Sequence, residues 1–113
     1  MSTAATLSHH LNAFSEGVDE IMLDFLPESV LFTPDGPLEG LEPIRGFFDG
    51  FLRSSPPELL AAMTVTRMDV VGDVAYIHWK AEPYIPLATD TFLVRDGKIM
   101  AQSFAVLAAP SAR

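Results

Sequence analysis

The stretch DFLPESVLFTPDGPLEGLEPIRGFFDGFL, residues 24–52, decides the fold more than any other part of the chain. Its segment SVLFT is rich in β-branched and aromatic residues and predicts a buried strand. PDGP is a strong turn signal, and a helix is expected over about residues 43–52, with Phe47, Phe48 and Phe51 on its apolar face. A strand, a turn and a new helix therefore follow one another within this one stretch.

The sequence before this stretch predicts two short helices. Apolar residues recur at spacings of three and four over residues 4–15, which indicates an amphipathic helix capped by Ser2 or Thr3. Residues 18–25 are expected to form a second helix that Pro27 ends.

The sequence after the stretch is strand-like from residue 59 onward. The segments MTVTRMDVV, VAYIHWKAE, ATDTFLVR and IMAQSFAVL predict strands, with a loop at PYIPL. Asp96-Gly97, between the last two, is the best hairpin signal in the chain, and residues 108–113 are expected to form a frayed tail. Helices followed by an antiparallel sheet predict an α+β fold, with residues 1–113 as one domain.

Composition excludes several classes of function. A formal charge of −8, with no cluster of Lys and Arg, disfavours nucleic acid and anionic membrane surfaces as partners. There is no Cys, the N-terminal residues do not resemble a signal peptide, and no apolar run approaches membrane-spanning length, so a cytoplasmic protein is expected. The three His residues lack metal-ligand spacing and no glycine-rich phosphate loop is present, so neither a metal nor another cofactor is expected.

Asp90 and Gln102 are the polar residues that strand alternation places among apolar neighbours. Asp90 shares a strand face with Phe92, Gln102 shares one with Phe104, and Trp79 lies on the apolar face of its own strand. If these faces line the interior, burial raises the pKa of Asp90, and its neutral acid can donate a hydrogen bond to a developing oxyanion. The alternative is an Asp90 that is solvated at a strand end or that binds a backbone N–H.

His10 is the second candidate for chemistry. Adjacent helical residues lie about 100° apart, so only one of His9 and His10 can face the core. His10 falls inside the apolar stripe, between Leu7 and Phe14. It is a candidate general acid, base or hydrogen-bond donor, able to form an acid–base couple with Asp90, or else a core histidine whose hydrogen bonds are satisfied.

The order of elements and several short motifs resemble the nuclear transport factor two-like superfamily, which includes SnoaL-like polyketide cyclases and ketosteroid isomerases. The motifs are PDG at residues 34–36, IRGFF at residues 44–48 and FLVRDGKI at residues 92–99. The resemblance implies a cone-shaped, curved antiparallel β-sheet wrapped around N-terminal helices, a cystatin-like α+β barrel. It also implies a homodimer through the outer sheet face. Alternation predicts an outward set that includes Val74, Tyr76, His78, Lys80, Thr91, Leu93 and Arg95.

The resemblance further implies roles for individual residues. In ketosteroid isomerases a helix Tyr and a strand Asp form the oxyanion hole, and a second Asp carries the proton. Here His10 falls at the position of that Tyr, Asp90 at the oxyanion Asp, and Thr33 at the base. A Thr hydroxyl is not a base near neutral pH, which argues against ordinary ketosteroid isomerase activity. Asp35, two residues on, either points the same way or only forms the turn.

Three functions follow from the sequence. The first is a cofactor-free isomerase, cyclase or epoxide hydrolase that acts on a small apolar molecule, with His10 and Asp90 as catalytic groups. The second is a module that binds an apolar ligand in the same pocket without turnover, or docks a partner on its sheet. The third is a dimeric domain whose own side chains fill the cavity. The expected substrate-binding residues are Phe14, Thr33, Trp79, Phe92, Gln102 and Phe104.

Overall fold

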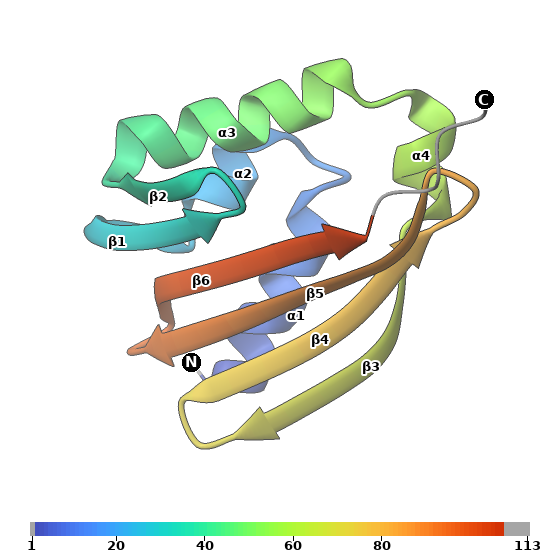
Figure 1. The fold of residues 1–113 in the computed structure, drawn as a ribbon. Coiled ribbons are helices and arrows are strands. Elements are labelled where there is room, and N and C mark those ends of the chain that lie inside the picture. Colours follow the sequence, from blue (N-terminus) through green and yellow to red (C-terminus); the bar gives the residue numbers. More distant parts are fainter. Residues whose placement is uncertain (1, 108–113) are drawn as a thin grey trace.

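In a computed structural model of the chain, residues 2–107 are described, and they form helices packed on one face of a curved, open sheet (Figure 1). The expected tail at residues 108–113 lies outside the described residues. The helices are α1 (Thr3–Ala13), α2 (Val18–Met22), α3 (Leu41–Ser54) and α4 (Pro57–Ala62). The strands are β1 (Phe25–Thr33), β2 (Gly36–Glu39), β3 (Thr64–Val71), β4 (Val74–Ala81), β5 (Ile85–Arg95) and β6 (Lys98–Leu107). The predicted α+β class is confirmed.

The six strands run in the order β2-β1-β6-β5-β4-β3, so the sheet has two free edges. Its strands pair antiparallel except for β1 and β6, which run parallel, a correction to the expected antiparallel sheet. The reason lies in the connection: α3 and α4 carry the chain from β2 to β3 at the opposite edge (Figure 1). Three hairpin reversals then bring β6 back beside β1 in the same direction.

The first long strand begins earlier than the sequence predicts. The second helix was expected to reach residue 25, but α2 ends at Met22 and β1 starts at Phe25. The backbone is already paired there, because Ile99 donates its N–H to the carbonyl of Asp24 at 2.7 Å. Pro27 lies inside β1, where the register against β6 shifts and the ladder does not need its missing N–H.

Three other local expectations are also corrected. The segment from Leu59, expected to be strand-like, begins inside α4, which carries Pro57 in its first turn. Residues 36–39, which begin in the predicted PDGP turn, form a short strand against β1 that the sequence did not predict. The loop expected at PYIPL is partly strand, since β5 already begins at Ile85.

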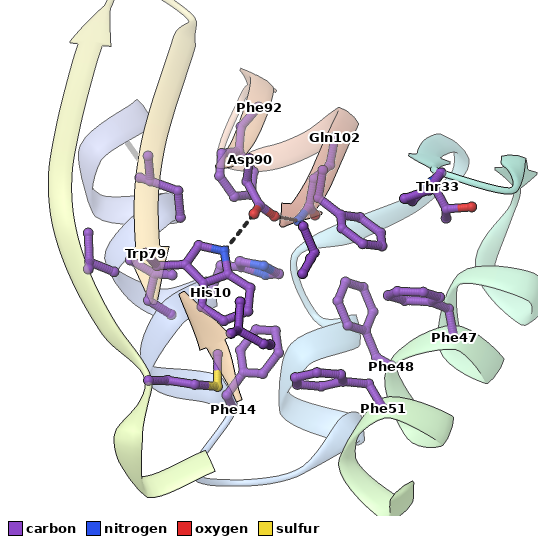
Figure 2. A pocket seen from close by; sticks show the side chains of 18 of the residues that line it. His10, Phe14, Thr33, Phe47, Phe48, Phe51, Trp79, Asp90, Phe92 and Gln102 are labelled. Carbon is purple, nitrogen blue, oxygen red and sulfur yellow. Dashed lines mark hydrogen bonds between the residues drawn. The ribbon is translucent and has the colours of Figure 1, made fainter. Parts of the chain in front are cut away.

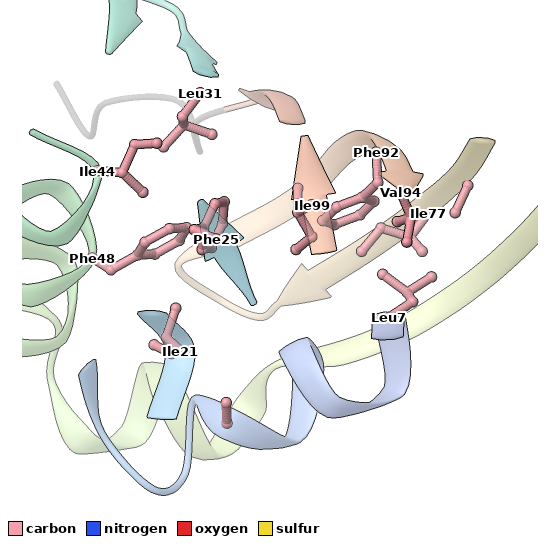
Figure 3. Close-up of a cluster of buried hydrophobic side chains, with 12 residues drawn as sticks. Leu7, Ile21, Phe25, Leu31, Ile44, Phe48, Ile77, Phe92, Val94 and Ile99 are labelled. Carbon is pink, nitrogen blue, oxygen red and sulfur yellow. The ribbon is translucent and has the colours of Figure 1, made fainter. Parts of the chain in front are cut away.

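The helices and the inner sheet face share one apolar core (Figure 3). α1 packs on β4 and β5, and α3 packs on β1 and β2. Core residues Ala75, Val94 and Ile99 lie near the β3–β4 and β5–β6 hairpins, and the cavity lies toward the other end of these strands. Fully buried members of the core are Leu7, Ile21, Leu31, Ile44, Ile77, Phe92, Val94 and Ile99. Over residues 2–107, no helix has both the length and the apolar character needed to cross a bilayer.

Candidate functional site

A cavity of about 600 Å³ lies between α1, α3 and the inner face of the sheet (Figure 2). Its volume is typical of sites for small molecules, and its wall is mostly apolar and aromatic. α3 contributes one side because its Phe residues recur at helical spacing and turn toward the sheet. The rings that line the cavity are Phe14, Phe47, Phe48, Phe51, Trp79, Phe92 and Phe104.

The structure brings the eight residues singled out from the sequence to this one cavity. They come from α1, β1, β4, β5 and β6, and so from both halves of the chain. Their catalytic or binding roles stay predictions. The residues are His10, Phe14, Thr33, Trp79, Asp90, Phe92, Gln102 and Phe104.

Asp90 lies at the polar end of the cavity, only 8% exposed. Trp79 donates its Nε1–H to Asp90 Oδ1 at 2.8 Å, and Gln102 donates its Nε2–H to Oδ2 at 2.8 Å (Figure 2). The strand register explains this geometry. Asp90 stands opposite Ile77 and Phe104, so its two donors are the diagonal neighbours on the same sheet face.

Burial and hydrogen bonding act on Asp90 in opposite directions. Burial disfavours the charged carboxylate and raises the pKa of Asp90, while the two N–H donors from Trp79 and Gln102 lower it. Burial is the larger effect, so the pKa of Asp90 lies above its usual value. A group of this kind exchanges a proton at a higher pH than an exposed Asp, as general acid–base chemistry requires.

His10 is 1% exposed and sits among aromatic rings. Its ring meets those of Phe14, Phe92 and Phe48 edge to face, with centroids 5.2, 5.4 and 5.8 Å away. Burial, with a smaller contribution from the neighbouring His9, lowers the pKa of His10 to about 3. It is therefore neutral near pH 7.

The hydrogen bonds of His10 differ from both readings of the sequence. Among residues 2–107, its Nδ1 is buried and has no hydrogen-bond partner, unlike the core histidine with satisfied hydrogen bonds that the sequence allows. In the part of the chain that the structure describes, no hydrogen bond joins His10 to Asp90, whose partners are Trp79 and Gln102. The two candidates face the same cavity as separate groups rather than as a hydrogen-bonded couple.

Thr33 reaches only the rim of the cavity. Its hydroxyl donates to the Gly36 carbonyl at 2.9 Å and accepts from the Asp35 N–H at 3.1 Å, so the β1–β2 turn occupies it (Figure 2). Asp35 is exposed on the same rim. The position where the resemblance implies a base therefore carries no buried carboxylate.

A second polar cluster, which the sequence did not reveal, lies on the outer side of α1. His9 Nδ1 lies 2.7 Å from Asp24 Oδ2, and its Nε2 lies 2.6 Å from Glu20 Oε2. Hydrogen bonds to Asp24 and then to Glu20 raise the pKa of His9. Burial raises the pKa of Asp24 despite its bond to His9. His9 is 15 residues from Asp24 and 11 from Glu20, and the three follow no motif, so only the fold reveals the cluster.

The polar role of Trp79 was also missed. The sequence predicts Trp79 as part of an apolar wall, yet its indole N–H holds Asp90. The signal was available, since a buried Trp usually finds an acceptor for its N–H. Over residues 2–107, no group of three or more His, Cys, Asp and Glu side chains could hold a metal ion.

Comparisons with known proteins place this geometry on a known fold. No family model matches the sequence, and a search of curated proteins finds no match. Solved structures do match. An NTF2-like protein of unknown function from Burkholderia xenovorans is 14% identical, with a TM-score of 0.77 over 98% of this chain and 87% of that chain.

Two further structural neighbours carry the names of enzymes. A candidate polyketide cyclase from Sinorhizobium meliloti is 18% identical, with a TM-score of 0.73 over 89% of this chain and 94% of its own. A candidate ketosteroid isomerase from Kribbella flavida is 15% identical, with a TM-score of 0.68 over 98% of this chain and 82% of its own. The chain therefore has the nuclear transport factor two-like fold that the sequence motifs predicted.

Proposed function

We propose that the cavity binds a small, mostly apolar molecule and that Asp90 exchanges a proton with it, as in a cofactor-free isomerase, cyclase or hydrolase. The observation that carries the proposal is a carboxyl group buried in an aromatic cavity and fixed by two N–H donors. The names of two structural neighbours, a candidate cyclase and a candidate isomerase, support the same class of chemistry.

The geometry assigns a different task to each polar group. Asp90 is the base, because its raised pKa makes the carboxylate a stronger proton acceptor than an exposed Asp. Trp79 and Gln102 hold its oxygens in place, so no reorganisation is needed when the proton moves. Neutral His10 supplies a hydrogen bond rather than a proton, because its pKa is about 3.

The test combines binding with proton exchange. Trp79 is the only tryptophan and touches Asp90, so its fluorescence should be quenched saturably by naphthol, a mimic of an enolate. NMR in deuterated water then follows exchange at carbons beside the carbonyl in a panel of cyclic ketones. We expect Asp90→Asn to slow that exchange by a factor of about 100 or more. Asp49→Asn, which removes the same charge outside the cavity, is the matched control. Equal exchange in wild type and Asp90→Asn would disprove the proposal.

Binding without turnover is the second candidate function, and the rim of the cavity favours it. The Thr33 hydroxyl is engaged in the turn, and the ionisable groups of residues 2–107 that line the cavity are His10, Asp35 and Asp90. A single buried carboxyl with a neutral His beside it suits a binding site as well as a proton shuttle. Naphthol quenching without exchange in any ketone of the panel would favour this function over catalysis.

We propose that the outer face of the sheet pairs with a second copy of the chain. Apolar side chains stand exposed on that face, among them Val71 at 79%, Val74 at 45% and Leu107 at 61%. Sedimentation at several concentrations tests this, with Leu93→Glu as the variant because Leu93 stands opposite Val74 on the same face. We expect wild type to sediment as a dimer and the variant as a monomer. Met68→Lys, on the inner face of the edge strand β3, is the control.

A further inference from the structure

The polar end of the cavity presents the hydrogen-bond acceptors of a buried carboxyl group. Trp79 and Gln102 each direct an N–H at Asp90, one to each carboxylate oxygen. Gln102 Oε1 is buried without a partner, and each Asp90 oxygen keeps a further lone pair. Buried acceptors of this kind stabilise a bound molecule that brings N–H or O–H groups to them.

The charged groups that line the cavity among the described residues are acids. Among residues 2–107, its lining includes two acids, Asp90 at the polar end and Asp35 at the rim, and neither Lys nor Arg. His10, which faces Asp90 from α1, adds no positive charge near pH 7 because its pKa lies at about 3. Anionic ligands such as carboxylates and phosphates would meet an acid without a compensating cation.

The apolar wall also suits a cation. Seven aromatic rings surround the space in front of Asp90, and the face of an aromatic ring carries partial negative charge. A positive group within about 6 Å of such faces is attracted to them, more strongly where water is excluded. The net charge of −8 favours the approach of cations to the whole molecule.

We propose that the ligand of this cavity is an apolar molecule that carries a protonated amine, with its ammonium group on the Asp90 carboxylate and its apolar body among the rings. The inference rests on the binding function proposed above and names its ligand class. An ammonium group brings three donors and a charge, whereas a neutral alcohol brings one donor and an anion brings none. Of these three head groups, it alone can bond to both Asp90 oxygens and neutralise the buried carboxylate.

Three probes with the same apolar body test the proposal: 1-naphthylmethylamine, 1-naphthylmethanol and 1-naphthoate, titrated by calorimetry at pH 7.5 and low salt. We expect the amine to bind at least about tenfold more tightly than the alcohol, and the acid not to bind. Asp90→Asn should abolish the preference for the amine while changing the affinity for the alcohol less. Asp49→Asn is again the control for net charge.

A pH series sharpens the test. The ammonium group needs an ionised Asp90, and burial holds the pKa of Asp90 above its usual value. Amine affinity should therefore rise with pH through the pKa of Asp90, while alcohol affinity stays level or falls. In the part of the chain that the structure describes, the other ionisable groups on the cavity are His10, neutral above about pH 3, and Asp35 at the rim.

Specific outcomes would overturn the proposal. If the alcohol bound wild-type protein as tightly as the amine, the ligand class would be wrong, while a cavity that binds neutral apolar molecules would stand. If Asp35→Asn rather than Asp90→Asn removed the preference for the amine, the cation would bind at the rim and the assignment to Asp90 would be wrong. If none of the probes bound, the binding function itself would fail. Because wild-type selectivity is measured first, the test does not depend on whether Asp90→Asn folds.

Discussion

His9 and His10 are neighbours in α1, yet the two sides of the helix give them opposite properties. His9 projects outward between the carboxylates of Asp24 and Glu20, and these raise its pKa. His10 projects into the aromatic cavity without a partner for Nδ1, and burial lowers its pKa to about 3. A rotation of about 100° between adjacent helical positions separates the two environments.

The difference shows that the same residue type stabilises the fold in opposite pH ranges. The contribution of His10 is fully present above the unfolded pKa near 6.5 and is lost as the pH falls toward about 3, because only the unfolded chain takes up the proton. The contribution of His9 is fully present below the unfolded pKa and is lost as the pH rises through its raised folded pKa. Stability therefore falls in acid because of His10 on the inner side of α1, and falls at higher pH because of His9 on its outer side.

The largest expected loss of stability comes from truncating an aromatic ring that packs against His10 on the inner side of α1. Phe48 is 3% exposed and packs against His10, Phe14 and Phe25. Phe48→Ala should lower the free energy of unfolding by about 3–5 kcal/mol, measured by urea denaturation. It should also admit water beside His10 and move its pKa up toward 6.5, measured by NMR titration.

Phe48→Leu keeps most of the apolar contact and serves as the milder variant if Phe48→Ala does not fold. It should cost less stability and shift the pKa of His10 less than Phe48→Ala. An unchanged pKa of His10 in both variants would show that the aromatic shell does not cause its low value.

Removing the inner histidine should change how stability depends on pH. Wild type should lose about 1.4 kcal/mol per pH unit below the unfolded pKa of His10, or about 3 kcal/mol between pH 6.5 and pH 4. His10→Leu lacks this loss, so the difference in unfolding free energy between the two proteins should move in favour of the variant by that amount. Urea denaturation at several pH values measures it. Parallel stability curves would contradict the assignment of His10 as a buried neutral group.

Much of the fold could be predicted because local signals agree with it. The β-branched strand, the PDGP turn and the Phe spacing of α3 lie within one stretch, and alternation placed Asp90 and Gln102 on one sheet face with Phe92 and Phe104. The elements that were missed depend on tertiary pairing. β1 begins at Phe25 because that residue pairs with Ile99, far along the chain.

The candidate site was predictable in its members but not in its hydrogen bonds. Burial follows from sequence patterns, whereas the bonds of Asp90 depend on which diagonal neighbours reach it across β4 and β6. The polar cluster around His9 could not be predicted from the sequence for the same reason. Glu20 and Asp24 contact His9 only after α2 packs against α1. Sequence alternation shows which face a side chain takes, but not the atom it binds there.

A smaller effect is expected on the outer side. His9→Gln removes a cation between two carboxylates, so at pH 6 it should lower the unfolding free energy by about 1–2 kcal/mol. Well above the raised pKa of His9 the wild-type ring is neutral, and the difference between the two proteins should shrink toward zero. Thermal melts at pH 6 and at a pH well above the raised pKa of His9 measure this change. A loss of unfolding free energy that grew with pH would contradict the expected pH dependence of the His9 contribution.

The smallest expected effect is a difference between the contributions of two carboxylates to the pKa of His9. Asp24 is buried and contacts the ring through both oxygens, whereas Glu20 is partly exposed and contacts it through one. Asp24→Asn should therefore lower the pKa of His9 more than Glu20→Gln does, measured by NMR titration of the ring protons. Equal shifts in the two variants would mean that burial does not strengthen the bond to Asp24. The outer side would then behave as an ordinary surface ion pair, unlike the inner side, where burial dominates.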